Sequence, residues 1–135
     1  MAMYTVFDAP LQMLSDKPSL YYLWPECTDF ISKVPTVFDD SRTLQGEMGK
    51  YIITAKRKGT TWFVGAMTNW DERELELKLD FLDSASYKAV IFRDGVNASK
   101  SAEDYKREEM TVKKGDVLKL AMKSGGGWTA RFEKM

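Results

Sequence analysis

The sequence contains no histidine and only one cysteine, Cys27, among its 135 residues. Imidazole and thiolate groups are the main ligands of zinc in proteins, so a zinc site is close to excluded. Catalytic triads of the Ser-His-Asp or Cys-His kind are excluded as well, because each needs a histidine as its base. One cysteine cannot form an internal disulfide, so the cysteine content does not indicate the redox compartment.

Long apolar runs and an excess of either charge are also absent. No apolar run approaches the ~20 residues that a membrane-spanning helix needs. Residues 1–8 have neither a basic start nor a long apolar core, so we do not expect them to form a signal peptide. Lys and Arg number 20 and Asp and Glu also number 20, which gives a formal net charge of zero. Since nucleic-acid-binding domains usually carry a basic surplus, we expect no nucleic-acid partner and no membrane span.

The first 34 residues differ in pattern from those that follow. Residues 10–14 are compatible with a short helix that has proline at an early position, where its missing N–H costs nothing. Residues 26–33 predict one further short helix. A dense aromatic cluster lies between them and includes Tyr21, Tyr22 and Trp24. The segment is too short to bury its apolar side chains alone, so it either packs on the sheet that follows or belongs to a preceding domain.

From residue 36 onward the apolar pattern has a period of two, which indicates β-strands. The cleanest case is residues 73–79, where three leucines alternate with charged residues and point to one face. The other predicted strands lie near residues 36–44, 51–56, 62–67, 87–93, 105–112, 117–122 and 128–132. No helix separates successive strands, so we expect a mostly β fold, an antiparallel sandwich of about eight strands behind a short helical N-terminal segment. The basic residues 56–58 are expected to keep a sheet edge soluble.

Candidate catalytic groups are few. The adjacent carboxylates of Asp39 and Asp40, like those of Glu108 and Glu109, would face opposite sides of a strand. Such pairs do not form a glycosidase site, which needs two carboxyl groups ~5–10 Å apart around a sugar. Residues 94–97 have oxygen ligands for calcium but lack its spaced acidic pattern, so we interpret them as a turn. We therefore assign no catalytic, cofactor-binding or metal-binding residue.

Tryptophan is the residue type here that could bind sugar, because sugars present apolar faces to aromatic rings. Trp62 and Trp128 fall within predicted strands and are expected to pack in the core or on the sheet. Trp70 follows a central strand in a predicted turn. It is therefore our candidate for a carbohydrate or partner contact.

Several short segments together resemble the C-terminal part of glycoside hydrolase family 97, an α-glucosidase and α-galactosidase family. These segments are residues 9–14, 26–30, 34–36, 55–59, 65–70, 73–75, 94–97 and 125–128. No single segment is diagnostic, but their order and spacing are fairly specific, and they cover nearly the whole chain.

The resemblance implies a parent enzyme with an N-terminal β-sandwich, a catalytic (β/α)8 barrel and a C-terminal β-sandwich. Residues 1–34 would then be the helical end of the barrel, and residues 35–135 the C-terminal sandwich. The resemblance also implies that the catalytic carboxylates and calcium ligands lie upstream, so calcium is a cofactor of the parent and none is expected in this chain. A parent of this family is expected in the periplasm, or otherwise outside the cytoplasm, of a Gram-negative bacterium.

Three functions follow from these observations. The first is a non-catalytic domain that packs on the barrel, stabilises it and mediates oligomer contacts. The second is a carbohydrate-binding module that uses exposed aromatic residues such as Trp70. The third is a self-associating module, in which Tyr21, Tyr22 and Trp24 belong to an exposed apolar patch of the kind that marks interfaces. The same three aromatic residues are the candidate barrel contacts under the first function.

Overall fold

The computed structural model describes residues 1–14 and 17–135. Three short helices occupy the N-terminal part of the described chain: α1 (Ala2–Val6), α2 (Pro18–Tyr21) and α3 (Pro25–Ser32). Eight strands follow: β1 (Asp40–Glu47), β2 (Tyr51–Lys58), β3 (Thr61–Thr68), β4 (Arg73–Lys78), β5 (Ser86–Asp94), β6 (Tyr105–Lys113), β7 (Val117–Met122) and β8 (Gly127–Lys134).

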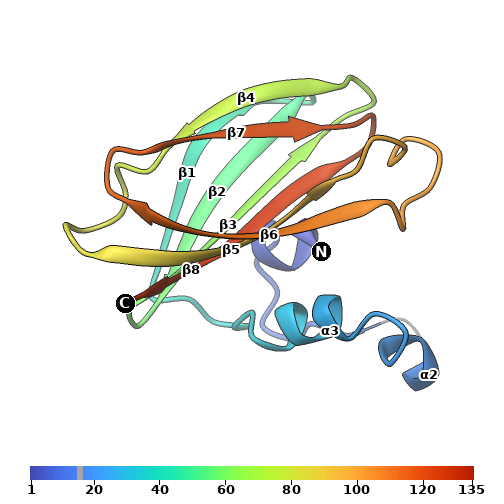
Figure 1. The fold of residues 1–135 in the computed structure, drawn as a ribbon, viewed down its shortest axis with the longest axis horizontal. Coiled ribbons are helices and arrows are strands. Elements are labelled where there is room, and N and C mark those ends of the chain that lie inside the picture. The colour runs from blue at the N-terminus through green and yellow to red at the C-terminus, as the bar shows by residue number, and fades with distance from the viewer. Residues whose placement is uncertain (15–16) are drawn as a thin grey trace.

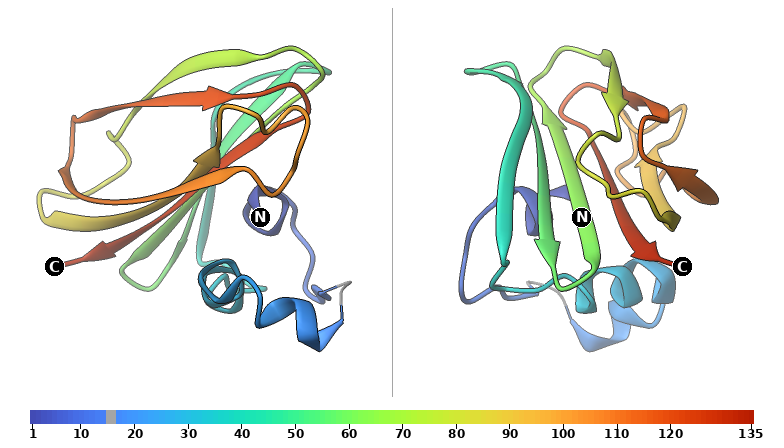
Figure 2. Two further views of the ribbon diagram at one scale, coloured as in Figure 1. Left: turned by 45° about the vertical axis from the view of Figure 1, so that its right-hand side comes forward. Right: turned by 90° about the vertical axis from the view of Figure 1, so that its left-hand side faces the viewer.

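The strands form two antiparallel sheets that pack face to face (Figure 1). The large sheet has six strands in the order β1-β2-β3-β8-β5-β6, and the small sheet pairs β4 with β7. The views in Figure 2 show the small sheet over one face of the large sheet and the helices below the other. This arrangement confirms the predicted fold class, an antiparallel sandwich behind a short helical segment.

The core between the two sheets follows from strand alternation. In β3, Trp62, Val64 and Ala66 point inward and are buried, and in β8 Trp128, Ala130 and Phe132 do the same. The small sheet closes this inner face with two buried leucines, Leu77 of β4 and Leu120 of β7, which belong to different register pairs of that sheet. Successive side chains of a strand point to opposite faces, so one face can be wholly apolar.

The outer face of the large sheet is covered by α1 and α3. Phe30 of α3 is buried against Phe63, Val90 and Phe92, which project outward from β3 and β5. The rings of Phe30 and Phe92 meet edge to face, with their centroids 5.1 Å apart. The N-terminal segment is thus folded onto the sheet, one of the two arrangements expected from the sequence.

Helix α1 approaches the sheet closely at a glycine. A Cβ added to Gly65 in β3 would lie 2.9 Å from the side chains of both Thr5 and Val6. Real Cβ atoms essentially never come this close, so Gly65 leaves the space that α1 occupies. The hydroxyl of Thr129 donates to the carbonyl of Val64 at 2.9 Å and lies 3.4 Å from the hydroxyl of Thr5.

Three local predictions differ from the structure. Residues 10–14 are not helical; the first helix is α1, further upstream, because it can rest on Gly65. The first strand begins at Asp40, not near residue 36, since residues 34–39 link α3 to the sheet. Lys56 does not protect a sheet edge, because β2 lies between β1 and β3 and its Lys56 side chain is 1% exposed.

Candidate interaction surfaces

Lys56 is a charged side chain buried on the outer face of the large sheet. Its Nζ donates to the carbonyl of Val6 at 3.0 Å and to Oδ1 of Asp8 at 2.6 Å. The ammonium group also lies 5.2 Å from the centroid of the Phe38 ring, within the range of a cation–π contact. A buried ammonium group is tolerated only when such partners replace water, so Lys56 holds the chain that follows α1 against β2.

Arg131 is a second buried cation on the same face, in β8. Its guanidinium lies 5.8 Å from the centroid of the Phe30 ring, and its Nε lies 3.0 Å from a carboxylate oxygen of Glu133. Neither Nε nor Nη1 of Arg131 makes a hydrogen bond among the described residues, so Glu133 acts as an ion-pair partner only. The outer face therefore combines aromatic packing with cations, whereas the inner face is apolar.

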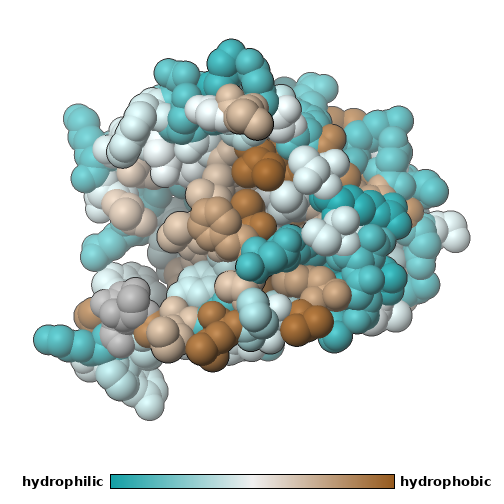
Figure 3. All heavy atoms as spheres, turned by 180° about the vertical axis from the view of Figure 1, so that it is seen from behind, coloured by the Kyte–Doolittle hydropathy of each residue, from teal (hydrophilic) through white to brown (hydrophobic). Residues whose placement is uncertain are grey.

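The predicted aromatic contacts of the N-terminal segment are unequally exposed. Tyr22 is 84% exposed, whereas Tyr21 and Trp24 are half-buried. Other large apolar side chains nearby in sequence are also exposed, and together with Tyr22 we call them the N-terminal apolar surface. Its members are Met3, Phe7, Leu11, Met13, Leu14, Tyr22 and Leu23. Seen from behind, apolar side chains gather along the lower part of the molecule, where this segment runs (Figure 3).

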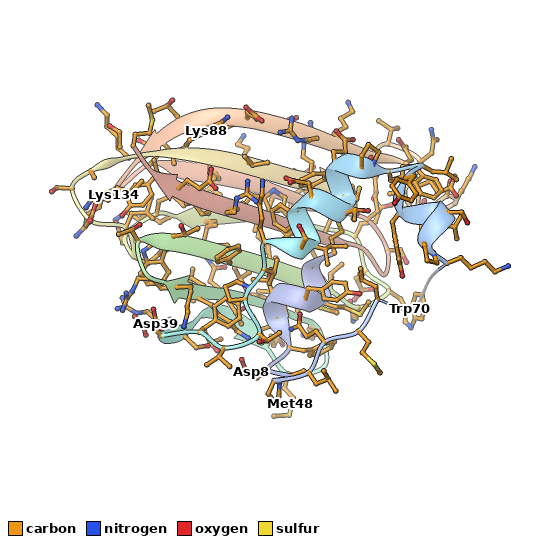
Figure 4. All side chains as sticks on the ribbon, turned by 90° about the horizontal axis from the view of Figure 1, so that it is seen from below. Asp8, Asp39, Met48, Trp70, Lys88 and Lys134 are labelled. Atoms are coloured by element: carbon orange, nitrogen blue, oxygen red, sulfur yellow. The ribbon has the colours of Figure 1, made fainter. Side chains whose placement is uncertain are left out.

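Trp70 lies in the turn between β3 and β4 and is 84% exposed. Its ring rests on the neighbouring β7–β8 turn, since a Cβ added to Gly125 would lie 3.2 Å from ring atom Cζ3. Trp70 projects from one end of the molecule and Lys134 lies at the other (Figure 4). Trp62 and Trp128 are buried, as predicted, and cannot add to an exposed aromatic platform around Trp70.

The adjacent carboxylates bind different partners. Asp39 accepts hydrogen bonds from the Lys58 side chain and the Gly59 N–H, whereas Asp40 pairs with Arg42. Hydrogen bonds from Gly59 and Lys58 lower the pKa of Asp39. In the second pair, Glu108 binds Arg93 while Glu109 binds Lys88 and Arg107. Each carboxylate has its own cationic partner, so neither pair forms a two-carboxylate centre.

Asp94 organises the turn between β7 and β8. Its Oδ2 accepts the backbone N–H groups of Lys123 at 2.8 Å and Gly127 at 3.2 Å. Gly126 lies so close that an added Cβ would be 1.9 Å from this oxygen. Burial raises the pKa of Asp94 despite these hydrogen bonds. The Asp94 carboxylate therefore accepts the backbone hydrogen bonds that hold the β7–β8 turn.

A small polar cluster joins α3 to β6. The hydroxyl of Tyr105 donates to Oε1 of Glu26 at 2.6 Å, and Cys27 lies beside it. Burial raises the pKa of both the Cys27 thiol and the Tyr105 hydroxyl, so neither is activated as a nucleophile. Across residues 1–14 and 17–135, no group of three or more acidic or cysteine side chains could hold a metal ion, and no helix is long and apolar enough to cross a membrane.

Sequence reasoning did not single out Met48 or Arg131, and it assigned Lys56 to a sheet edge. Met48, at the tip of the β1–β2 turn, is fully exposed. Lys56 and Arg131 are buried although their residue types favour the surface. Both cations lie at outward-facing positions of internal strands of the large sheet, Lys56 in β2 and Arg131 in β8. The sequence pattern did not indicate which segment covers that face of the sheet.

The fold and these surfaces define an accessory β-sandwich domain with a closely packed N-terminal extension. Residues 37–133 match the family model described as glycosyl-hydrolase 97 C-terminal, oligomerisation. The chain therefore belongs to the C-terminal domain family of glycoside hydrolase family 97, and the resemblance stated from the sequence is confirmed.

Similar proteins agree in sequence and fold. The chain is 46% identical over 133 residues to a retaining α-galactosidase of Bacteroides thetaiotaomicron, covering 98% of the chain and 20% of that protein. A glycoside hydrolase family 97 enzyme from Pseudoalteromonas sp. strain K8, solved with panose, superposes with a TM-score of 0.95 at 34% identity, covering 99% of the chain and 22% of that enzyme. A β-arabinopyranosidase structure at 24% identity shares the fold, with a TM-score of 0.77 over 96% of this chain and 20% of that one. The chain thus spans about a fifth of the length of these relatives.

Proposed function

We propose that the chain is the non-catalytic C-terminal domain of an α-glycoside hydrolase and that it packs on the catalytic barrel of the same protein. The observation that carries this proposal is the N-terminal apolar surface. Seven large apolar side chains are exposed within residues 3–23, with Leu11 and Met13 more than three-quarters exposed. Soluble proteins rarely leave such a group uncovered unless it is an interaction site.

The parent would hydrolyse α-galactosides or α-glucosides. Support for this substrate class comes from the relative named a retaining α-galactosidase and from the family 97 enzyme solved with panose. Calcium would bind in the missing catalytic part, as the family resemblance implies, and the parent would work outside the cytoplasm. Residues 1–34 would be the end of the barrel, even though they also pack on the sheet.

The test of catalysis uses this chain alone. We expect no hydrolysis of aryl α-galactosides or α-glucosides with calcium present. Turnover that disappears when one of the chain's own carboxylates is substituted would overturn the proposal.

The test of docking uses the full-length protein. We expect Tyr22→Asp combined with Leu23→Asp to lower its melting temperature and its hydrolytic activity, because two charges would be buried against the barrel. Val117→Asp is the matched control, since Val117 is also exposed but lies in β7 of the small sheet. Equal effects of the two variants would contradict barrel docking through this surface.

Carbohydrate binding is the second candidate function, and the exposure of Trp70 favours it. A sugar that stacks on Trp70 would change its fluorescence. We expect a saturable change with panose or maltotriose, lost in Trp70→Ala, if this candidate is correct. No saturable change at millimolar sugar would remove it.

A further inference from the structure

The two ends of the sandwich differ in what they expose. The antiparallel order places the β1–β2, β3–β4, β5–β6 and β7–β8 connections at one end, which we call the loop end (Figure 1). Three apolar side chains on these connections are strongly exposed: Met48, Trp70 and, at 74%, Val96. The other end exposes Val117 and the terminal Met135 beside several lysines.

The loop end is braced by hydrogen bonds between its turns. The Asn69 N–H donates to the Lys50 carbonyl, and the Asn69 carbonyl accepts the Gly125 N–H, both at 2.8 Å. The Asn69 side-chain oxygen accepts the Asp71 N–H at 3.0 Å, and its amide donates to the Gly49 carbonyl at 3.3 Å. Trp70 is therefore presented by a turn that is fixed on both sides. A fixed aromatic side chain loses little conformational entropy on binding.

The strand edges of the large sheet are poor contact surfaces. The β6 edge carries a run of charged residues at 106–109, and the β1 edge is irregular between Thr43 and Gln45. Charges and bulges on edge strands prevent pairing with another sheet. The exposed face of the small sheet carries Glu74, Glu76 and Lys119, and the outer face of the large sheet is covered by α1 and α3. The loop end is the remaining strongly apolar surface of the described sandwich.

The span of the family match separates the loop end from the N-terminal apolar surface. The match covers residues 37–133 and carries the description oligomerisation. Met48, Trp70 and Val96 lie inside this span, whereas the N-terminal apolar surface lies entirely before it. Two ion pairs flank the exposed turns: Lys50 pairs with Glu47, and Lys123 pairs with Glu72. Because each pair is neutral, these residues would not repel the same surface of a second copy.

We propose that the loop end is the surface through which two copies of this protein associate, with Trp70 as the anchor and Met48 as a second exposed contact. This inference rests on the proposed function, because it names the surface for oligomer contacts. A symmetric dimer would bring the same turns of both copies together, as two-fold interfaces require. Tryptophan is among the residues that contribute most to such interfaces.

The experiment is sedimentation across concentration with the full-length protein. We expect the wild type to dimerise and Trp70→Ala to raise the dissociation constant at least about tenfold, as truncation of an anchor residue does. Combining it with Met48→Asp should abolish the dimer. Val117→Asp, at the other end, should leave association unchanged, and circular dichroism should show every variant folded.

Several outcomes overturn the inference. A strictly monomeric wild type, or an unchanged dissociation constant in Trp70→Ala, excludes this surface as the dimer contact. A loss of hydrolytic activity and melting temperature with unchanged association assigns the loop end to the protein's own barrel. Saturable binding of panose at Trp70 with unchanged association assigns it to sugar. None of these results bears on docking through Tyr22 and Leu23, so failure here is distinguishable from failure of the proposed function.

Discussion

The two faces of the large sheet are covered by different means and have different chemistry. The inner face meets a second sheet, and the side chains buried there are apolar. The outer face meets two short helices and their linkers, and it buries Lys56, Arg131, Thr54 and Thr129 as well as phenylalanines. A sheet has no free backbone groups on its face to bind a buried cation. The end of a short helix has free carbonyl groups, and one of these, the Val6 carbonyl at the end of α1, accepts a hydrogen bond from Lys56.

This difference indicates that the outer face resembles an interface between domains, which is commonly more polar than a core. Burying a charge there is costly unless its partners are in place. The cations therefore fix where the N-terminal segment lies, while the inner face provides most of the hydrophobic stabilisation. The following predictions test that division, from the largest expected effect to the smallest.

Truncation on the inner face should have the largest effect. Phe132→Ala removes a fully buried ring that packs edge to face on Phe81, with centroids 5.9 Å apart. We expect the free energy of unfolding to fall by about 3–5 kcal/mol, measured by urea denaturation. Val117→Ala, on an exposed side chain of the small sheet, is the control and should change it little. A loss below about 1 kcal/mol in Phe132→Ala would contradict the assignment of the core.

A larger side chain at Gly65, where α1 contacts the sheet, should reduce stability by an intermediate amount and only on the outer face. Gly65→Val would place atoms where the Thr5 and Val6 side chains now lie. We expect a loss of about 1–3 kcal/mol, as for other overpacked sites. Hydrogen exchange should show α1 amides losing protection while β8 amides keep theirs. Loss of protection in both would mean that the two faces unfold as one unit.

Substitution of Lys56 should destabilise the fold more than substitution of its ion-pair partner Asp8. Lys56→Ala removes the cation from its buried site and frees the Val6 carbonyl, so we expect a loss of about 1.5–3 kcal/mol. Asp8 is 79% exposed, so Asp8→Asn should cost about 0.2–1 kcal/mol. Urea denaturation of both variants measures the difference. Equal losses would show that the pair behaves as a surface ion pair despite the burial of Lys56.

The smallest effect concerns pH at the edge of the inner face. Hydrogen bonds from Lys134 and the Ala85 N–H lower the pKa of Asp83 from 3.8 to about 2. A depressed pKa means that this group stabilises the fold above pH 3.8 and that its contribution is lost as pH falls toward 2. We expect Asp83→Asn to reduce the drop in melting temperature between pH 4.5 and pH 2, with Asp80→Asn as the control. An unchanged drop would contradict the role of this contact.

Much of the sandwich could be predicted from the sequence because some strands alternate and others are short apolar runs bounded by turn residues. The leucines of residues 73–79 indicated the buried side of β4, and residues 62–67 indicated a central strand apolar on both faces. The first strand was placed several residues too early, since residues 34–39 carry no alternation that marks where pairing begins. The helix expected at residues 10–14 was wrong because propensity alone does not report the space that Gly65 leaves for α1.

The surfaces were less predictable. Trp70 was identified as a candidate contact because it follows a strand within a turn, and Trp62 and Trp128 were expected to pack in the core or on the sheet because they lie within strands. Lys56 was assigned to a sheet edge, and the structure buries it inside β2. A lysine in a run of basic residues normally indicates solvent, and only the position of residues 6–8 shows otherwise.

The sequence alone determined the antiparallel β architecture, the missing histidine chemistry and the family resemblance, because strand period, residue content and motif order are properties of the chain itself. The tertiary structure decided which face of the large sheet each segment covers, that Lys56 and Arg131 are buried, and that the β1–β2 and β7–β8 turns meet the turn that carries Trp70. These features depend on contacts between residues far apart in sequence, such as Lys56 with Asp8 and Asn69 with Gly125. Such contacts leave no periodic signal, since each depends on how the whole sheet is ordered.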